Sequence, residues 1–191
     1  MLSFSLRRNT NLTTFDIPYN KIGSEGAKMI SDMLKERKAP PLESLNLYWN
    51  EIGLDGSKEL VETLCSQGSA AHPFHLGLGM NSVGPESAIL IAEMMKEKDN
   101  ILTLNLTNCK IGDEGGMAIA QALRSTKRFT LLNIDNAGLR DQPIIAIAEA
   151  FIDNPTITYA CARGNDITGM GTSACIKANL NSGGRVFSQR S

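Results

Sequence analysis

The sequence predicts an α/β solenoid: about six strand–turn–helix repeats stacked as a horseshoe, with a parallel β-sheet on the concave face and helices on the convex face. The clearest repeat is LESLNLYWNEIGLDGSKELVETL, residues 42–64. Its residues Leu45 and Leu47 alternate with polar neighbours, which is typical of a short strand, whereas Leu60 and Leu64 stand four apart, which is typical of a helix. Copies of this unit recur along the chain.

The copies are in phase over nearly the whole sequence. When Asn50 is taken as the marker of the turn after the strand, successive markers are separated by 30, 31, 28, 28 and 28 residues. The six markers are Asn20, Asn50, Asn81, Cys109, Ala137 and Asn165. Apolar residues stand three and five positions before every marker and two and ten positions after it. A pattern repeated in phase is far stronger evidence than one isolated motif.

Each element of the repeat has a physical reason. A single unit cannot bury its strand residues, so units must stack in parallel, and helices wider than strands curve the stack. The Asn or Cys marker can hydrogen-bond the backbone of adjacent buried turns. Glycines six positions after the marker are expected to let the chain turn tightly into the helix. These glycines are Gly26, Gly56, Gly115 and Gly171.

The segments LESLNLYWNEIG and ILTLNLTNCKIG resemble the leucine-rich repeat pattern LxxLxLxxN/CxL. The long period and the IGxxG step are similar to the ribonuclease-inhibitor-like subclass, which includes repeat domains of NOD-like receptors and of Ran-type GTPase-activating proteins. The resemblance spans roughly residues 6–180. It weakens at Ala137 and at Ala160 and Ala162, which replace the expected Asn and leucines. We therefore expect a repeat domain over residues 1–180 and a flexible tail, rich in Ser, Gly and Arg, over 181–191.

The beginning of the sequence leaves two explanations open. Residues 5–10 match the end of a repeat's helix, so the chain starts inside a repeat without a polar cap. Either the chain is part of a longer array, or an oligomer or short helix covers the open end. Self-association through the uncapped first repeat is thus one expectation.

Composition excludes several function classes. The chain has 19 basic and 20 acidic residues, a balance that argues against a nucleic-acid or membrane-surface partner. Four cysteines without a CxxC pair favour a reducing, cytoplasmic compartment over disulfides or a metal site. There is neither a long apolar run nor a signal peptide.

No catalytic arrangement is evident, and no cofactor is expected. His72 and His75, the two histidines, lack an acidic partner in their repeat. The segment GLGMNSVG lacks the GK[ST] ending of a phosphate loop, so it is interpreted as a strand with small outward residues.

Candidate binding residues occupy positions one, two, four and six before each marker, which are predicted to face outward. Aromatic residues gather in the first three copies and polar residues in the last three. The candidates for protein binding are Tyr19, Asn46, Tyr48, Trp49, His75, Met80, Asn105, Asn133, Asp135 and Arg163. Trp and Tyr are enriched at binding hot spots. Two alternatives stay open. Trp49 packs on a neighbouring turn, and the polar strip of the last three copies is a solvated sheet face. The polar strip consists of Asn105, Asn108, Asn133, Asp135, Asn136 and Arg163.

The predicted function is a scaffold that binds a protein partner on its concave face. The resemblance to Ran-type proteins implies an alternative, activation of a small GTPase, although the acidic tail of that family is absent here. A third hypothesis is the sensing or autoinhibitory end of a larger receptor.

Overall fold

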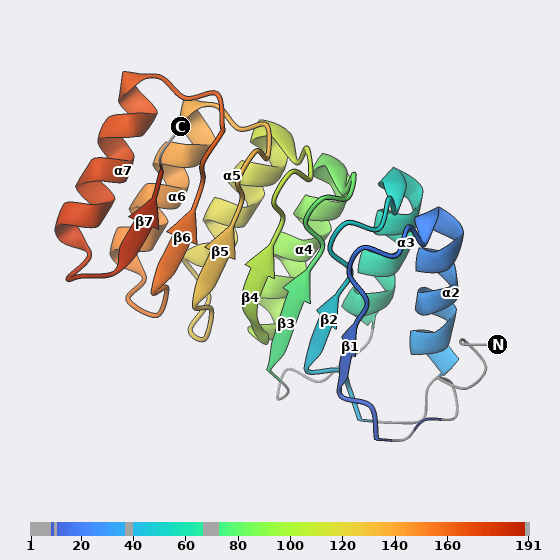
Figure 1. Ribbon diagram of the computed structural model, residues 1–191. Helices are drawn as coiled ribbons and strands as arrows, with labels where there is room; N and C mark the ends of the chain where they lie inside the picture. The colour runs from blue at the N-terminus through green and yellow to red at the C-terminus, as the bar shows by residue number, and fades with distance from the viewer. Residues whose placement is uncertain (1–8, 10, 37–39, 67–72, 190–191) are drawn as a thin grey trace.

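The computed structural model describes residues 9, 11–36, 40–66 and 73–189. In this part of the chain, strands and helices alternate without exception. The elements are β1 (Thr14–Asp16), α2 (Gly23–Glu36), β2 (Ser44–Asn46), α3 (Gly53–Ser66), β3 (Phe74–Gly77), α4 (Gly84–Lys98), β4 (Ile101–Asn105), α5 (Gly112–Leu123), β5 (Leu131–Asn133), α6 (Asp141–Asp153), β6 (Tyr159–Cys161), α7 (Gly169–Asn181) and β7 (Val186–Ser188). The strands form one parallel sheet in chain order, with the helices along one side of it (Figure 1). The predicted α/β solenoid is confirmed.

The register of the sheet follows the sequence repeat. Phe15 pairs with Leu45, Leu45 with Leu76, and Leu76 with Leu104. These residues all stand five positions before a marker, and Leu45 and Leu104 are fully buried. The markers therefore occupy equivalent turns of successive repeats.

The marker side chains form hydrogen bonds between neighbouring turns, as predicted. Asn81 Oδ1 accepts hydrogen bonds from the backbone N–H groups of Asn50 and Ile52 at 3.0 and 3.1 Å. Its Nδ2 donates to the carbonyls of Leu47 and Leu78 at 2.8 and 2.9 Å. Because Asn81 is only 3% exposed, these bonds satisfy backbone groups that water does not reach.

Other markers continue this series of hydrogen bonds between turns, which we call the marker ladder. Asn50 and Asn165 repeat the bonding pattern of Asn81. Cys109 Sγ donates to the Leu78 carbonyl at 3.2 Å. Ala137 carries no polar side-chain atom, so the ladder has a gap at the fifth repeat.

The expected role of the helix glycines is wrong. The turn into the helix is made three positions after the marker, for example at Gly53, whose φ is +74°. Gly56 lies inside α3, and a Cβ atom there would approach the Cα of Ser24 to 2.9 Å. It therefore permits close contact between α2 and α3 rather than a turn.

The expected flexible tail also differs from the structure. Residues 186–188 form β7, which pairs in parallel with β6. Phe187 is 1% exposed, and its ring meets Phe151 edge to face at 5.5 Å between centroids. Arg185 Nη1 donates to the carbonyls of Phe151, Asn154 and Ile157 at 2.6, 2.8 and 3.0 Å. A cation thus satisfies carbonyls at the end of α6 and in the connection to β6, so the ordered repeats extend past residue 180.

Candidate protein-binding surface

The helices leave one face of the sheet uncovered (Figure 1). We call it the strand face and define it by the residues two, four and six positions before each marker. On β1, exposed Thr14 and Asp16 flank buried Phe15, as the alternation predicted. Cys161 breaks the rule, since it is 1% exposed although it stands at an outward position. Its strand, β6, lies between β5 and β7.

Three aromatic side chains meet at the exits of β1 and β2. The ring of Tyr19 lies 5.5 Å from that of Tyr48 and 5.7 Å from that of Trp49, centroid to centroid. Tyr19 is 66% exposed and Trp49 45% exposed. We call these three residues the aromatic cluster. Two large aromatic side chains are thus in contact with solvent on a face that the helices do not cover.

The position directly before each marker of the first three repeats has an uncommon backbone conformation. Tyr19, Trp49 and Met80, each one position before a marker, have φ values of +61°, +52° and +60°. Bulky side chains rarely adopt positive φ, and the cost is about 1–3 kcal/mol per residue. The same position in the last three repeats holds Asn108, Asn136 and Gly164, also at positive φ. Asn and Gly tolerate this conformation better.

Gly79 leaves room for the ring of Tyr48. A Cβ atom at Gly79 would lie 2.9 Å from two carbons of the Tyr48 ring and 2.9 Å from Asn105 Oδ1. The glycine-rich segment of the third repeat therefore lets Tyr48 lean across the sheet. Partial burial there raises the pKa of the Tyr48 hydroxyl.

The remaining candidates of the first three repeats adjoin the cluster. Asn46 accepts from the backbone N–H of Tyr48 at 3.1 Å and donates to Asp16 Oδ1 at 2.9 Å. Met80 is half-buried at the position that Trp49 holds one repeat earlier. His75 is exposed, and its Nδ1 lies 2.9 Å from Thr103 Oγ1.

The polar strip is largely occupied by its own hydrogen bonds. Asn105 and Asn133 accept from backbone N–H groups two residues further on, at 3.0 and 3.1 Å. Asp135 Oδ1 accepts from the Arg163 N–H at 2.6 Å. Arg163 itself is exposed, with its Nε donating to Ser188 Oγ at 3.2 Å. Asn46 makes the same bond in the second repeat, so these bonds do not separate the two groups of candidates. A role of the polar strip in binding stays a prediction.

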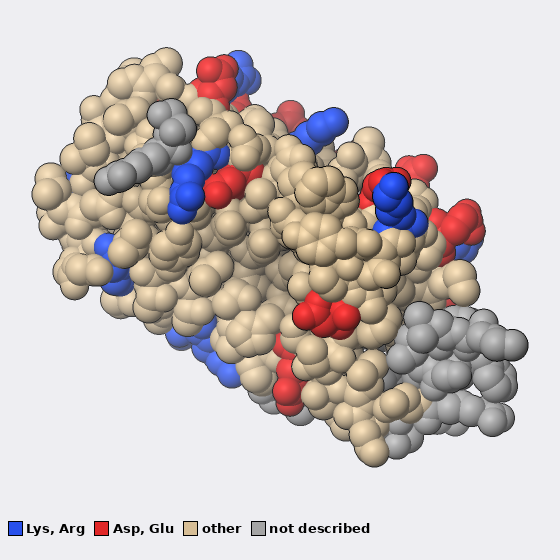
Figure 2. Space-filling model, in the orientation of Figure 1, with Lys and Arg blue, Asp and Glu red and all other residues tan. Residues whose placement is uncertain are grey.

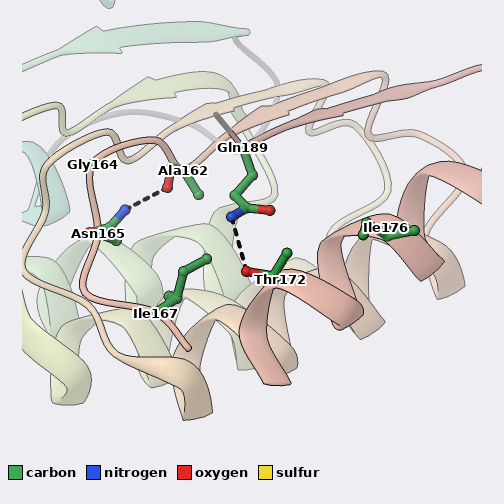
Figure 3. Close-up of a pocket in the computed structure, with 7 residues that line it drawn as sticks. All are labelled: Ala162, Gly164, Asn165, Ile167, Thr172, Ile176 and Gln189. Atoms are coloured by element: carbon green, nitrogen blue, oxygen red, sulfur yellow. Dashed lines mark hydrogen bonds between the residues drawn. The ribbon is translucent and has the colours of Figure 1, made fainter. Parts of the chain in front are cut away.

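A cavity of about 620 Å³ lies at the C-terminal end of the stack, between the turn after β6 and α7 (Figure 3). It is lined by Ala162, Gly164, Asn165, Ile167, Thr172, Ile176 and Gln189. The Gln189 amide donates to Thr172 Oγ1 at 3.4 Å. None of the lining side chains is ionisable, so the cavity offers no acid, base or nucleophile with a matched pKa.

Reactive and metal-binding groups are sparse. Burial raises the pKa of the Cys109 thiol to about 12 and that of Cys175 to about 11, so both thiols stay protonated at neutral pH. Among the described residues, no group of three His, Cys, Asp or Glu side chains is placed to hold a metal ion. The same residues contain no helix of the length and apolarity needed to cross a membrane. The expectation of self-association concerns the first repeat, most of whose opening residues lie outside the described part of the chain.

Comparison with known proteins identifies the fold. Three segments of the chain, residues 8–31, 38–61 and 99–120, match the sequence model of the family described as Leucine Rich repeat. All three end at the same position of the repeat, the buried helix position occupied by Ser31, Val61 and Ala120. The fold is a leucine-rich repeat solenoid.

A solved structure shares this architecture. The chain is similar to the structure of "Leiomodin-1 Actin-Binding Site 2 (ABS2)", with a TM-score of 0.57 and 16% sequence identity. The match covers 81% of this chain and 86% of the other. At this identity the likeness concerns the leucine-rich repeat fold alone. Among curated proteins, no sequence match was found.

Proposed function

We propose that this protein is a binding scaffold whose strand face recognises a protein partner through the aromatic cluster. The observation that carries the proposal is the pairing of exposure with strain. Tyr19 and Trp49 are both exposed and held at positive φ, whereas later repeats place Asn or Gly at that position. Lys21, Glu51 and Lys110 also have positive φ, so strain alone does not single out the cluster. What supports a binding role is that the strained side chains here are aromatic and exposed.

The cluster also has the chemistry of a binding hot spot. Tyr and Trp supply large, rigid apolar area together with a polar tip, and they dominate measured interface energies. Tyr48 is anchored on Gly79 and so loses little side-chain freedom when a partner binds.

Capture of partners from a lysate of the source cells tests the proposal. The native chain is compared with Trp49→Asn, which places at the second repeat the residue that the fourth and fifth repeats carry. Asn136→Gly is the matched control, because it changes the same position in the fifth repeat to the residue of the sixth. A partner lost with Trp49→Asn and retained with Asn136→Gly is the expected result. Equal recovery with all three proteins contradicts the proposal.

The alternative, activation of a small GTPase, is supported only by the resemblance to Ran-type repeat domains. Its test is hydrolysis of GTP by a panel of small GTPases with and without the chain; actin, bound by the leiomodin-1 site, is a natural probe for the capture experiment. As for compartment, the free state of Cys65, Cys109, Cys161 and Cys175 supports a reducing, cytoplasmic location.

A further inference from the structure

Among the described residues in the strands and turns of the first two repeats, exposed acids outnumber exposed cations. Lys21, two residues after Tyr19, is the cation, against the acids Asp16, Glu43 and Glu51. Asp16 lies in β1 and Glu43 directly precedes β2, and both side chains are exposed. The strand-face positions of the first three repeats contain no Lys or Arg. Acidic side chains gather on this face over β1 and β2 (Figure 2). The chain as a whole carries a net charge of only -1, so this acidity is local.

Both carboxylates belong to the first two strand segments: Asp16 is at a strand-face position, and Glu43 lies just before β2 at the edge of that face. Asp16 pairs in register with Asn46, and Tyr48 follows two residues later, a distance of about 7 Å along the strand. Glu43 stands five residues before Tyr48, about 17 Å away in extended chain. The Glu43 N–H donates to the Thr13 carbonyl at 2.7 Å, which holds this residue beside the first repeat.

Asp16 is also fixed in position. The Asn46 amide donates to its Oδ1 at 2.9 Å, so the carboxylate stays on the strand face beside the second repeat. The acidic residue of the polar strip differs, because Asp135 is adjacent to a cation: its Oδ1 accepts from the Arg163 backbone, and the Arg163 guanidinium is nearby. The unbalanced negative charge therefore belongs to the first two repeats.

This inference rests on the function proposed above and specifies the partner. We propose that the partner presents a basic, extended segment to the first two repeats. An apolar or aromatic side chain of that segment lies on the aromatic cluster, and Lys or Arg side chains two to five residues away lie against Asp16 and Glu43.

Several physical effects favour a basic segment over an acidic one. A guanidinium or ammonium group is attracted both to carboxylates and to the faces of Trp and Tyr rings. Charge complementarity also steers the encounter and rejects partners of the same sign. An extended strand advances about 3.3 Å per residue, which sets the spacing between anchor and basic residues.

An array of dye-labelled 12-residue peptides tests the inference. Each peptide has one Phe with Lys or Arg two to five residues away, and each has a charge-inverted twin with Glu or Asp instead. Binding to the native chain is measured by fluorescence anisotropy at low and high salt. Basic peptides are expected to bind, with an affinity that falls as the salt concentration rises. Their acidic twins are expected not to bind. Binding of the acidic twins, or of no peptide at all, overturns the inference.

Variants of the chain separate charge from aromatic contact. The double variant Asp16→Asn/Glu43→Gln keeps the shape of both side chains and should weaken basic peptides about five- to tenfold, the effect of two exposed ion pairs. Glu62→Gln, on the exposed side of α3 in the same repeat, is the matched control and should change nothing. Unaltered affinity in the double variant overturns the inference.

Trp49→Asn distinguishes this inference from the function it rests on. If Trp49→Asn abolishes peptide binding but the charge substitutions leave the affinity unchanged, the partner is not basic and the aromatic cluster remains the proposed site. If basic peptides bind Trp49→Asn as tightly as the native chain, the aromatic cluster is not the site, and both proposals fall.

Discussion

The first three repeats and the last three are built on one frame but use its variable positions differently. One residue before the marker, the first half carries Tyr19, Trp49 and Met80, whereas the second half carries Asn108, Asn136 and Gly164. All six residues have positive φ. The backbone requirement is thus the same in both halves, and only the second half satisfies it with residues that tolerate it.

The two halves also differ in the contacts made at the start of each helix. In the second half, carboxylates at the helix starts accept from the next repeat: Asp113 from the Arg140 N–H at 2.8 Å, and Asp141 from the Thr168 N–H at 2.8 Å. The equivalent position of the first repeat holds Ser24, which donates to the Ile52 carbonyl instead. At this position the second half thus links its repeats through carboxylates and the first repeat through a hydroxyl. Binding by the first half stays the proposal made above.

The largest expected effect concerns the marker ladder. Asn81→Ala removes a buried side chain that bonds two N–H groups and two neighbouring carbonyls, and should reduce the free energy of unfolding by about 4 kcal/mol. The reverse change, Ala137→Asn, fills the gap in the ladder and should raise stability by about 1 kcal/mol. Urea unfolding followed by circular dichroism measures both. If the two variants shift the midpoint in the same direction, the ladder does not act as described.

The next largest effect on stability concerns Arg185, whose guanidinium binds carbonyls near the end of α6. Arg185→Ala leaves the carbonyls of Phe151, Asn154 and Ile157 without their donor and removes the cation from the Phe151 ring, 4.7 Å away. We expect a loss of about 2–3 kcal/mol, since hydrogen bonds to charged groups are among the stronger ones. Hydrogen exchange should show the loss of protection in α6 and α7 before α2. Unchanged stability would restore the interpretation of this segment as a dispensable tail.

The contribution of Asp141 to stability is expected to depend on pH. Hydrogen bonds from the Thr168 hydroxyl and from backbone N–H groups lower the pKa of this carboxyl below its usual 3.8. A lowered pKa contributes stability that is present above pH 3.8 and is lost as the pH falls through the folded-state value. Asp141→Asn should therefore unfold at a lower temperature than the native chain at pH 7, and the difference should shrink below pH 4.

Asp153→Asn, at the exposed end of the same helix, provides the control for this experiment. Its melting temperature should follow that of the native chain at every pH. A gap between native chain and Asp141→Asn that is as wide at pH 3 as at pH 7 would show that ionisation of Asp141 plays no part.

Much of the fold could be predicted because its core is periodic. Each repeat places apolar residues at the same offsets from a marker, and the markers stack as the spacing indicated. The contact among Tyr19, Tyr48 and Trp49 was also predictable, because equivalent positions of adjacent repeats must be neighbours. The role of that contact in binding stays a prediction.

The expectation of a flexible tail failed where residues depart from the repeat. Phe187 follows Ala160 by 27 residues instead of 28, and polar Gln189 stands where other repeats have an apolar residue. These two departures hid the seventh strand. Positive φ before the marker was signalled by Asn108, Asn136 and Gly164, but the bulky residues of the first half concealed it.

The smallest expected effect is the most direct test of the central claim, which is that Trp49 serves binding and not packing. Trp49→Asn relieves strain of about 1–3 kcal/mol and removes an aromatic contact worth about 0.5–1.5 kcal/mol, so stability should stay within about 1 kcal/mol of the native value or rise. The measurement is the urea unfolding midpoint of Trp49→Asn against that of the native chain. A midpoint equal or higher supports the account; a loss of about 3 kcal/mol, typical of removing a buried aromatic residue, would contradict it and make Trp49 part of the core.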